Sequence, residues 1–159
     1  MPDRLDTTDR KILRELMAEG RVTNVTLAQR AGITAPPCLR RVRALEEAGF
    51  IRGYHAEIDE GMLGYHLVVF VMVTLHNQSE ADLRAFEDAL LRWPLVREAY
   101  MMSGEVDYML KCVATGMPAF ETSLLRELAA TPNVASVKTA VSIKKTKDEP
   151  GIPIDMADV

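Results

Sequence analysis

The sequence has 159 residues, of which 48% are hydrophobic, and its formal net charge at pH 7 is -4. This length is enough to bury a core, as one large domain or as two small ones. The longest apolar run, Leu67–Leu75, is about half the length of a membrane-spanning helix, so a buried strand is expected there instead. The two cysteines, Cys38 and Cys112, have no CxxC spacing and are expected as reduced thiols of a cytoplasmic protein without a membrane partner.

Charge is distributed unevenly along the chain. Residues 1–59 contain ten Lys or Arg against nine Asp or Glu, whereas residues 60–143 contain six against ten. Within the first block, residues 20–45 include five arginines and no acidic residue. A local positive field attracts a polyanion even when the whole protein is acidic, so the net charge does not exclude a nucleic-acid partner. The change in composition also favours two domains.

Three helices are predicted in the first block. The first covers about 8–19, the second ends at Gly32, and the third begins at Pro36 and Pro37 and ends before Gly49. Proline suits a first helical turn because its φ is preset and its missing N–H would have no partner there. The sequence therefore predicts a helix–turn–helix arrangement.

The third predicted helix has a core face and a basic face. Projection at helical spacing places Cys38 and Leu45 on the core side, and Arg40 and Arg43 on the opposite side, with Arg41 at the flank. A basic helix after a tight turn is typical of a segment that reads a DNA duplex. The alternative is that these arginines form only a solvated surface.

The second block is predicted as strand, helix, strand, strand, helix, strand. The strands are expected at about 67–76, 96–102, 108–114 and 134–143, with helices after Ser79 and Met117. Two βαβ halves predict a ferredoxin-like sandwich in which helices cover one face of the sheet. The first strand is apolar on both sides, so the other face is expected to pack against a second copy of the chain.

The fold class expected from these elements is α+β. The domains are a helix–turn–helix over 1–52, a linker strand and hinge over 53–64, a ferredoxin-like βαββαβ domain over 65–147 and a mobile tail over 148–159. The three histidines and two cysteines match no metal-ligand spacing, and no phosphate-binding or nucleophile motif is present, so no metal, cofactor or enzymatic activity is expected.

Two stretches, "PPCLRRVRALEEAGFIRGY" and "SGEVDYMLK", resemble the Lrp/AsnC group of leucine-responsive and asparagine-linked regulators. The resemblance covers nearly the whole chain except its last dozen residues. It implies a transcription factor that joins an N-terminal, winged-helix-like reader of double-stranded DNA to a C-terminal sensor of a small amino-acid effector. It also implies a homodimer, often assembled as four dimers into an octamer, with the effector bound between dimers.

The resemblance also assigns residues to two sites. The candidate DNA-binding residues are Thr34, Ala35, Pro36, Pro37, Arg40, Arg41, Arg43, Ala44 and Arg30. The candidate effector-binding residues are Met101, Ser103, Gly104, Glu105, Asp107, Tyr108, Met117, Ala140, Val141 and Ser142.

The effector loop has a physical rationale and an alternative. Gly104 permits close backbone approach, neighbouring N–H groups can bind a carboxylate, and Asp107 can meet an α-ammonium. Alternatively, Asp107 holds the turn and the methionines fill a core. Glu105 and Ala140 depart from the leucine-responsive pattern, so the sequence leaves the effector's identity open.

Two other functions compete with a regulator. A siroheme-decarboxylase-like enzyme has a similar two-domain architecture, but His55, His66 and His76 form no common motif and the arginine face is retained. A ligand-binding module without a DNA function would differ from a regulator in being indifferent to Arg40→Ala or Arg43→Ala.

Overall fold

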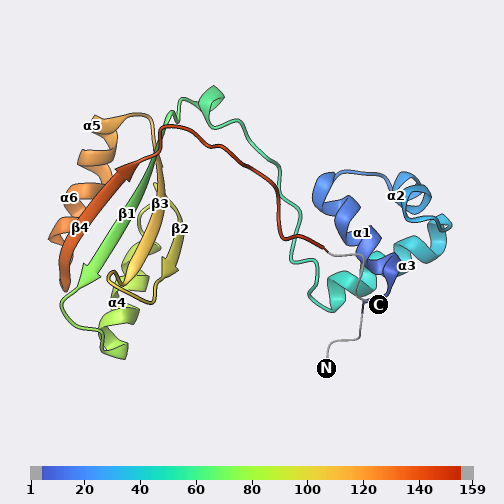
Figure 1. The fold of residues 1–159 in the computed structure, drawn as a ribbon, viewed down its shortest axis with the longest axis horizontal. Coiled ribbons are helices and arrows are strands. Elements are labelled where there is room, and N and C mark those ends of the chain that lie inside the picture. Colours follow the sequence, from blue (N-terminus) through green and yellow to red (C-terminus); the bar gives the residue numbers. More distant parts are fainter. Residues whose placement is uncertain (1–4, 155–159) are drawn as a thin grey trace. The chain divides into compact units, whose positions relative to one another are not determined.

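The computed structural model describes residues 5–154, which form two compact units (Figure 1). The first unit consists of residues up to Ile58 together with the segment that begins at Lys147, and the second consists of Asp59–Thr146. The chain therefore passes between the units twice. Residues 155–159 of the expected mobile tail lie outside the described part of the chain. None of the helices within 5–154 is long and apolar enough to cross a membrane.

The first unit is a bundle of three helices, α1 (Thr7–Ala18), α2 (Asn24–Ala31) and α3 (Ala35–Glu47). A capping box starts α1, because Asp6 accepts a hydrogen bond from the Asp9 N–H and donates its own N–H to the Asp9 carboxylate. Gly32 ends α2 with a left-handed φ of 77°, as the sequence predicted. The turn after it leads directly into α3.

The core of the first unit determines which face of α3 is exposed. Cys38 and Leu45 are buried in α3, as its helical projection predicted, against Ile12 of α1 and Leu27 of α2. The opposite face of α3 consequently points away from the bundle.

The second unit is a four-stranded antiparallel sheet with helices on one side. Its elements are a 3₁₀ turn (Gly61–Leu63), β1 (Leu67–Leu75), α4 (Glu80–Leu90), β2 (Val96–Met101), β3 (Tyr108–Ala114), α5 (Met117–Phe120), a π-helical turn (Glu121–Leu125), α6 (Arg126–Ala130) and β4 (Val134–Val141). The strand order is β2-β3-β1-β4, and every neighbouring pair is antiparallel. The predicted α+β class, a helix–turn–helix unit followed by a ferredoxin-like βαββαβ unit, is confirmed.

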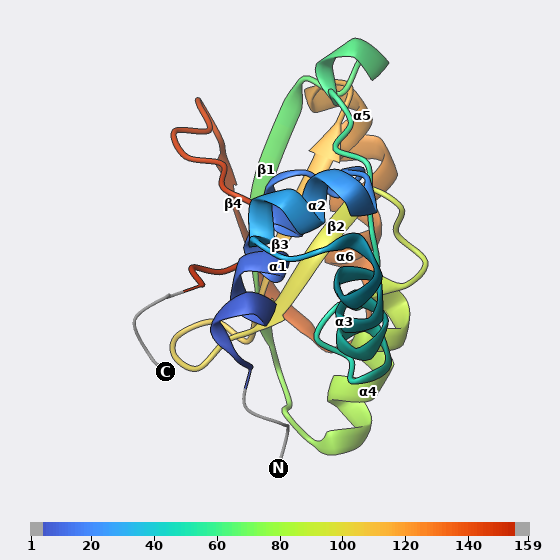
Figure 2. The same ribbon diagram turned by 90° about the vertical axis from the view of Figure 1, so that its right-hand side faces the viewer.

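Helices α4, α5 and α6 cover a single face of this sheet (Figures 1 and 2). Val69, Val71 and Val73 of β1 point into the core on that side, where they are fully buried. Because side chains alternate along a strand, Phe70 and Met72 point to the other face, where they are partly exposed. We call this second face, which carries no helix of its own unit, the open sheet face.

The expected linker strand is not formed. Residues 51–59 are not assigned to a strand, and no strand in the described part of the chain pairs with them. A strand exists only through hydrogen bonds to a neighbouring strand, and an alternating sequence does not supply that neighbour. The linker is attached to the first unit by a side chain instead, since the Tyr54 hydroxyl donates to the Glu46 carboxylate over 2.9 Å.

Candidate nucleic-acid interface and effector-binding regions

The start of α3 is held in place by its sequence and by α2. Pro36 and Pro37 occupy the first turn of α3, and Thr34 precedes it in an extended conformation without a side-chain capping bond. The Asn24 side-chain amide at the start of α2 donates to the Ala35 carbonyl over 2.8 Å. The tight connection therefore fixes the direction in which α3 leaves the turn.

Arg41 is bound within the first unit. Its guanidinium donates to the carboxylates of Asp6 and Asp9, each over 2.7 Å, and these hydrogen bonds raise its pKa. Burial alone would raise the pKa of Asp6, but the Asp9 N–H and Arg41 outweigh burial, so that the pKa of Asp6 is lowered. Arg41 therefore joins α3 to the N-terminus of α1.

Arg30 on α2 is also bound within the first unit. Its guanidinium lies 2.9 Å from the Glu19 carboxylate and 3.4 Å from that of Glu15. The bond to Glu19 is the main reason that the pKa of Arg30 is raised. Much of the positive charge of Arg30 is therefore balanced by α1.

Arg40 and Arg43 differ from these two arginines. Neither has an ion-pair partner among residues 5–154, and both side chains lie on the exposed side of α3. They line a shallow hollow with other residues of α3. The lining residues, which we call the exposed α3 face, are Pro36, Leu39, Arg40, Arg43, Ala44 and Glu47. Two unpaired guanidinium groups on one helix face can bind phosphate or the edge of a guanine.

The predicted effector loop lies between β2 and β3. Its ends are joined by a hydrogen bond from the Met102 N–H to the Asp107 carbonyl, 2.8 Å long. Gly104 has φ 142°, in the region that favours glycine, and a Cβ there would meet no atom within 4 Å. Ser103, Gly104 and Glu105 are all exposed, so the tip of the loop is open to a ligand.

Asp107 anchors the loop to the end of β1. One carboxylate oxygen accepts the Leu75 N–H over 2.7 Å, and the other accepts the Gln78 side-chain amide over 2.7 Å. The geometry corresponds to the alternative in which Asp107 holds the turn. A ligand ammonium would have to share oxygens that are already hydrogen-bonded.

Tyr108 has its side chain on the core side of the sheet. Its ring is 2% exposed, and its centroid lies 4.8 Å from that of Phe86. Burial, and then the Glu87 carboxylate that accepts its hydroxyl, raise the pKa of Tyr108 to about 12. A ligand at the surface of this unit would therefore meet the backbone of Tyr108 and not its ring.

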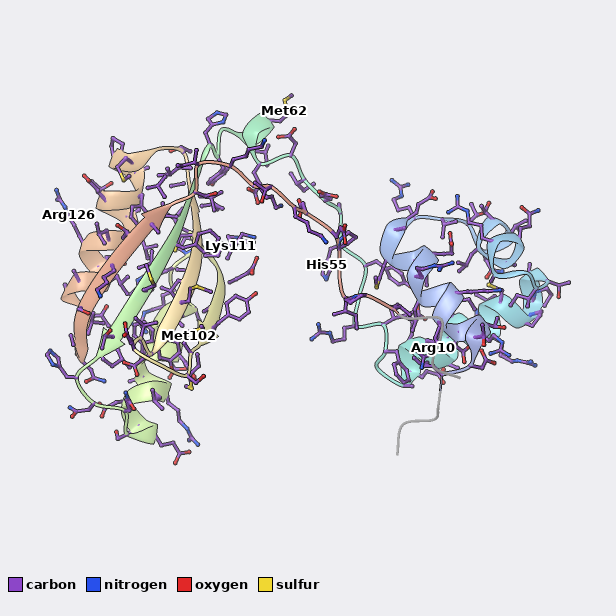
Figure 3. All side chains as sticks on the ribbon, viewed as in Figure 1. Arg10, His55, Met62, Met102, Lys111 and Arg126 are labelled. Atoms are coloured by element: carbon purple, nitrogen blue, oxygen red, sulfur yellow. The ribbon has the colours of Figure 1, made fainter. Side chains whose placement is uncertain are left out.

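The candidate effector residues lie at two opposite ends of the sheet. The loop is attached near the end of β1, whereas the Ser142 N–H donates to the Val68 carbonyl near the start of β1. Met117, at the start of α5, lies at the same end as Ser142, and Met102 lies at the other (Figures 1 and 3). Leu75 follows Val68 by seven positions along the strand, which is about 23 Å at roughly 3.3 Å per residue. One amino acid cannot contact both groups within one chain.

Two family models match the chain, and together they cover most of it. Residues 5–52 match a winged helix-turn-helix DNA-binding domain, and residues 68–152 match the Lrp/AsnC ligand binding domain. The chain belongs to the Lrp/AsnC family of transcriptional regulators. It is thus a transcription regulator with a DNA-binding helix–turn–helix and a ligand-binding domain.

Several relatives of this Lrp/AsnC regulator are similar over most of its length. A leucine-responsive regulatory protein of Rhizobium meliloti (strain 1021) is 56% identical over 91% of this chain and 92% of its own. A bkd operon transcriptional regulator of Pseudomonas aeruginosa is 41% identical, over 88% and 92%. A transcriptional regulator of Neisseria meningitidis, solved in complex with L-Met, has a TM-score of 0.91 and 32% identity, covering 96% and 98% of the two chains.

Sequence reasoning omitted Leu39 from the exposed α3 face of this regulator. Leu39 is 40% exposed and lies beside Arg40 and Arg43 in the shallow hollow. An apolar side chain in that position can contact a thymine methyl group. Helical spacing could have predicted this position, because Leu39 follows Pro36 by three residues and precedes Arg43 by four, which places all three on one helix face.

Replacing Arg41 with alanine is expected to destabilise the first unit by about 1 kcal/mol at neutral pH, because two carboxylates lose their shared partner. The folded pKa of Asp6 lies below its ordinary value of 3.8. The stabilisation is therefore complete above that value and is lost as pH falls through the folded pKa. Urea-dependent hydrogen exchange at the amides of α1 would measure the difference at pH 7 and at pH 3. An undiminished difference at pH 3 would contradict the assignment, and Arg40→Ala is the control.

Proposed function

We propose that this Lrp/AsnC regulator binds DNA sequence-specifically through the exposed α3 face and that a small amino acid modulates this binding. The observation that carries the proposal is the contrast among the arginines of the first unit. Arg30 and Arg41 are neutralised within the unit, whereas Arg40 and Arg43 are exposed and have no ion-pair partner among the described residues. Two exposed cations on one helix face give that face a local positive field, which attracts a polyanion such as DNA.

The remaining assignments to the DNA site rest on position. Thr34, Ala35, Pro36 and Pro37 form the N-terminal end of α3, which is the part of a recognition helix that approaches base edges. Ala44 lies on the exposed α3 face with the two arginines. Arg41 and Arg30 are proposed to contribute by orienting the helices, with less direct contact to DNA.

The proposed assembly is a homodimer formed through the open sheet face. Phe70 lies opposite Lys111 and Ala140 in the sheet register, and Met72 lies opposite Met109. These partly exposed apolar side chains occupy the centre of the face, and a second copy of the same face would cover them. We also propose that the dimers assemble further to an octamer and that the protein acts in the cytoplasm.

A polar cluster on the open sheet face fits a self-complementary contact. Lys111, which projects away from the helices (Figure 3), donates to the Glu98 carboxylate over 2.6 Å, and the Tyr100 hydroxyl donates to the same carboxylate over 2.6 Å. The Lys111 ammonium is the main reason that the pKa of Glu98 is lowered. Covering such a cluster costs less than covering an unpaired charge, because each of its charged groups keeps a partner.

The proposed effector is an aliphatic amino acid bound between chains. The relatives are a leucine-responsive protein, a bkd operon regulator and a protein complexed with L-Met. In one chain, the loop of residues 103–107 and the group of Met117 and Ala140–Ser142 are too far apart to share an amino acid. A ligand that contacts both groups must therefore lie between two chains, with the loop of one chain on one side and the Ala140–Ser142 group of another chain on the other side. Ligand binding is then coupled to assembly.

The proposal is tested by titrating the purified protein onto the DNA upstream of its own gene. The titration is repeated across a salt series and with each amino acid. We expect an affinity that falls steeply with salt and changes with one aliphatic amino acid, because phosphate contacts release counterions. Affinity equal to that for random DNA, with and without every amino acid, would contradict the choice of operator. An effector-independent operator complex would contradict the amino-acid assignment alone.

A further inference from the structure

The segment after β4 returns to the first unit and lies against α1. Gly151 is so close to Met17, in the last turn of α1, that a Cβ at Gly151 would lie 3.0 Å from the Met17 Sδ and 3.3 Å from its Cε. Separations of that size are tighter than ordinary van der Waals contact. Ile154 is partly buried, whereas Ile152 is 70% exposed, so the segment has one side against the protein and one toward solvent.

Two features of the backbone at position 151 favour glycine. Gly151 has φ 69°, in the left-handed region that residues with a side chain rarely adopt. It also follows Pro150, and a proline followed by a glycine with positive φ is typical of a tight turn. The turn brings the backbone onto the Met17 side chain, where the absence of a Cβ permits the contact.

The incoming linker is attached at the same end of α1. A Cβ at Gly20, two residues after the end of α1, would lie 3.7 Å from the Tyr54 ring, whose hydroxyl is bonded to Glu46. Burial, and then Glu46, raise the pKa of Tyr54 to about 12. The two segments that connect the first unit to the second are therefore both anchored within one helical turn, between Met17 and Gly20.

We propose that residues 147–154 are a second tether, docked on α1, through which the end of β4 controls the position of the DNA-binding unit. The proposed effector residues Ala140–Ser142 end five residues before Lys147, so a displacement of β4 reaches α1 through a short chain. Arg41 links α1 to α3, which carries the exposed α3 face. The regulatory part of this proposal rests on the proposed function. For residues 148–154 we propose a docked segment in place of the mobile tail that the sequence predicted.

The electron paramagnetic resonance spectrum of a nitroxide attached at Ile152→Cys in the full chain tests the docking, because position 152 is 70% exposed and the two native cysteines are buried. We compare Met17→Ala with Met62→Ala, because Met62 is 83% exposed in the second unit and provides the same substitution away from the contact. Met17→Ala is expected to raise the ratio of mobile to immobilised label about fivefold, the order expected for loss of a partly buried methionine contact. Met62→Ala is expected to leave this ratio unchanged. A fully mobile label on the wild-type tail would overturn the docking.

A second variant changes the tail and leaves the sequence of α1 intact, so that release of the tail cannot be attributed to damage in α1. Gly151→Val is expected to displace the segment, because the left-handed φ is strained for a branched side chain and its Cβ would press on the Met17 side chain. The core of the first unit contains no residue of this segment, so α1, α2 and α3 should keep their wild-type hydrogen exchange. A mobile label at position 152 with an intact bundle supports the tether, and a label as immobilised as in the wild-type background overturns it.

The regulatory part is tested by the ratio of DNA affinities with and without L-leucine or L-methionine. Both Met17→Ala and Gly151→Val are expected to reduce this ratio at least twofold toward one, with DNA binding retained. An unchanged ratio in a variant whose tail has been released would overturn the transmission through β4. If neither amino acid changes DNA binding by the wild type, the proposed effector fails, while the mobility of the label at position 152 still decides whether the tail is docked.

Discussion

Replacing both Arg40 and Arg43 with alanine is expected to weaken operator binding at least about thirtyfold, because each contact with a base edge is worth about 1–3 kcal/mol. Any contact of these residues with phosphate should also lower the slope of log affinity against log salt by about one each. Fluorescence anisotropy with operator and random duplexes, at several salt concentrations, measures both quantities. The two arginines lie on the exposed side of α3, so the fold should be unaffected.

The matched control is Arg41→Ala on the same helix. Arg41 is bound to Asp6 and Asp9, so its loss should weaken binding mainly by loosening α1 against α3, with a smaller change in the salt slope. An equal salt-slope change in the Arg41 variant and in the Arg40 variant would contradict the division of roles. Unchanged operator affinity in the double variant would remove the exposed α3 face from DNA recognition.

Replacing Met72 with glutamate is expected to convert the proposed dimer to monomers at micromolar concentration. Met72 lies in the centre of the open sheet face, opposite Met109 and Lys138 in the register. A two-fold contact buries the new carboxylate in both copies at once, and the desolvation of each charge costs several kcal/mol even when Lys138 pairs with it. The dimer dissociation constant should rise at least about a thousandfold, which sedimentation equilibrium measures.

Leu91→Glu is the control for this substitution. Leu91 follows α4 on the helix-covered side of the unit and is 86% exposed, so the same charge change there should leave the mass in solution unchanged. A Met72→Glu protein with wild-type mass would show that the dimer uses a different surface. Circular dichroism of both variants separates loss of assembly from loss of the fold.

The elements and the fold class of this protein were determined by local sequence. Helical spacing placed Cys38 and Leu45 in the core, glycine at position 32 ended α2, and prolines 36 and 37 began α3. The apolar strand Leu67–Leu75 was predicted within one residue of its observed end. These features depend on periodicity and on the backbone preferences of single residues, so neighbouring positions carry enough information to predict them.

Only the tertiary structure decided which candidate residues are available for function. Arg40 and Arg41 are neighbouring arginines that the sequence analysis both assigned to DNA binding, yet Arg41 is neutralised by Asp6, which lies 35 positions away. Asp107 is bonded to Leu75, 32 positions away, and the Tyr108 ring lies in the core. The candidate effector residues were all assigned from the same family resemblance, but they form two groups at opposite ends of the sheet. Such partners are brought together by packing between distant segments, which the periodicity of a single segment cannot encode.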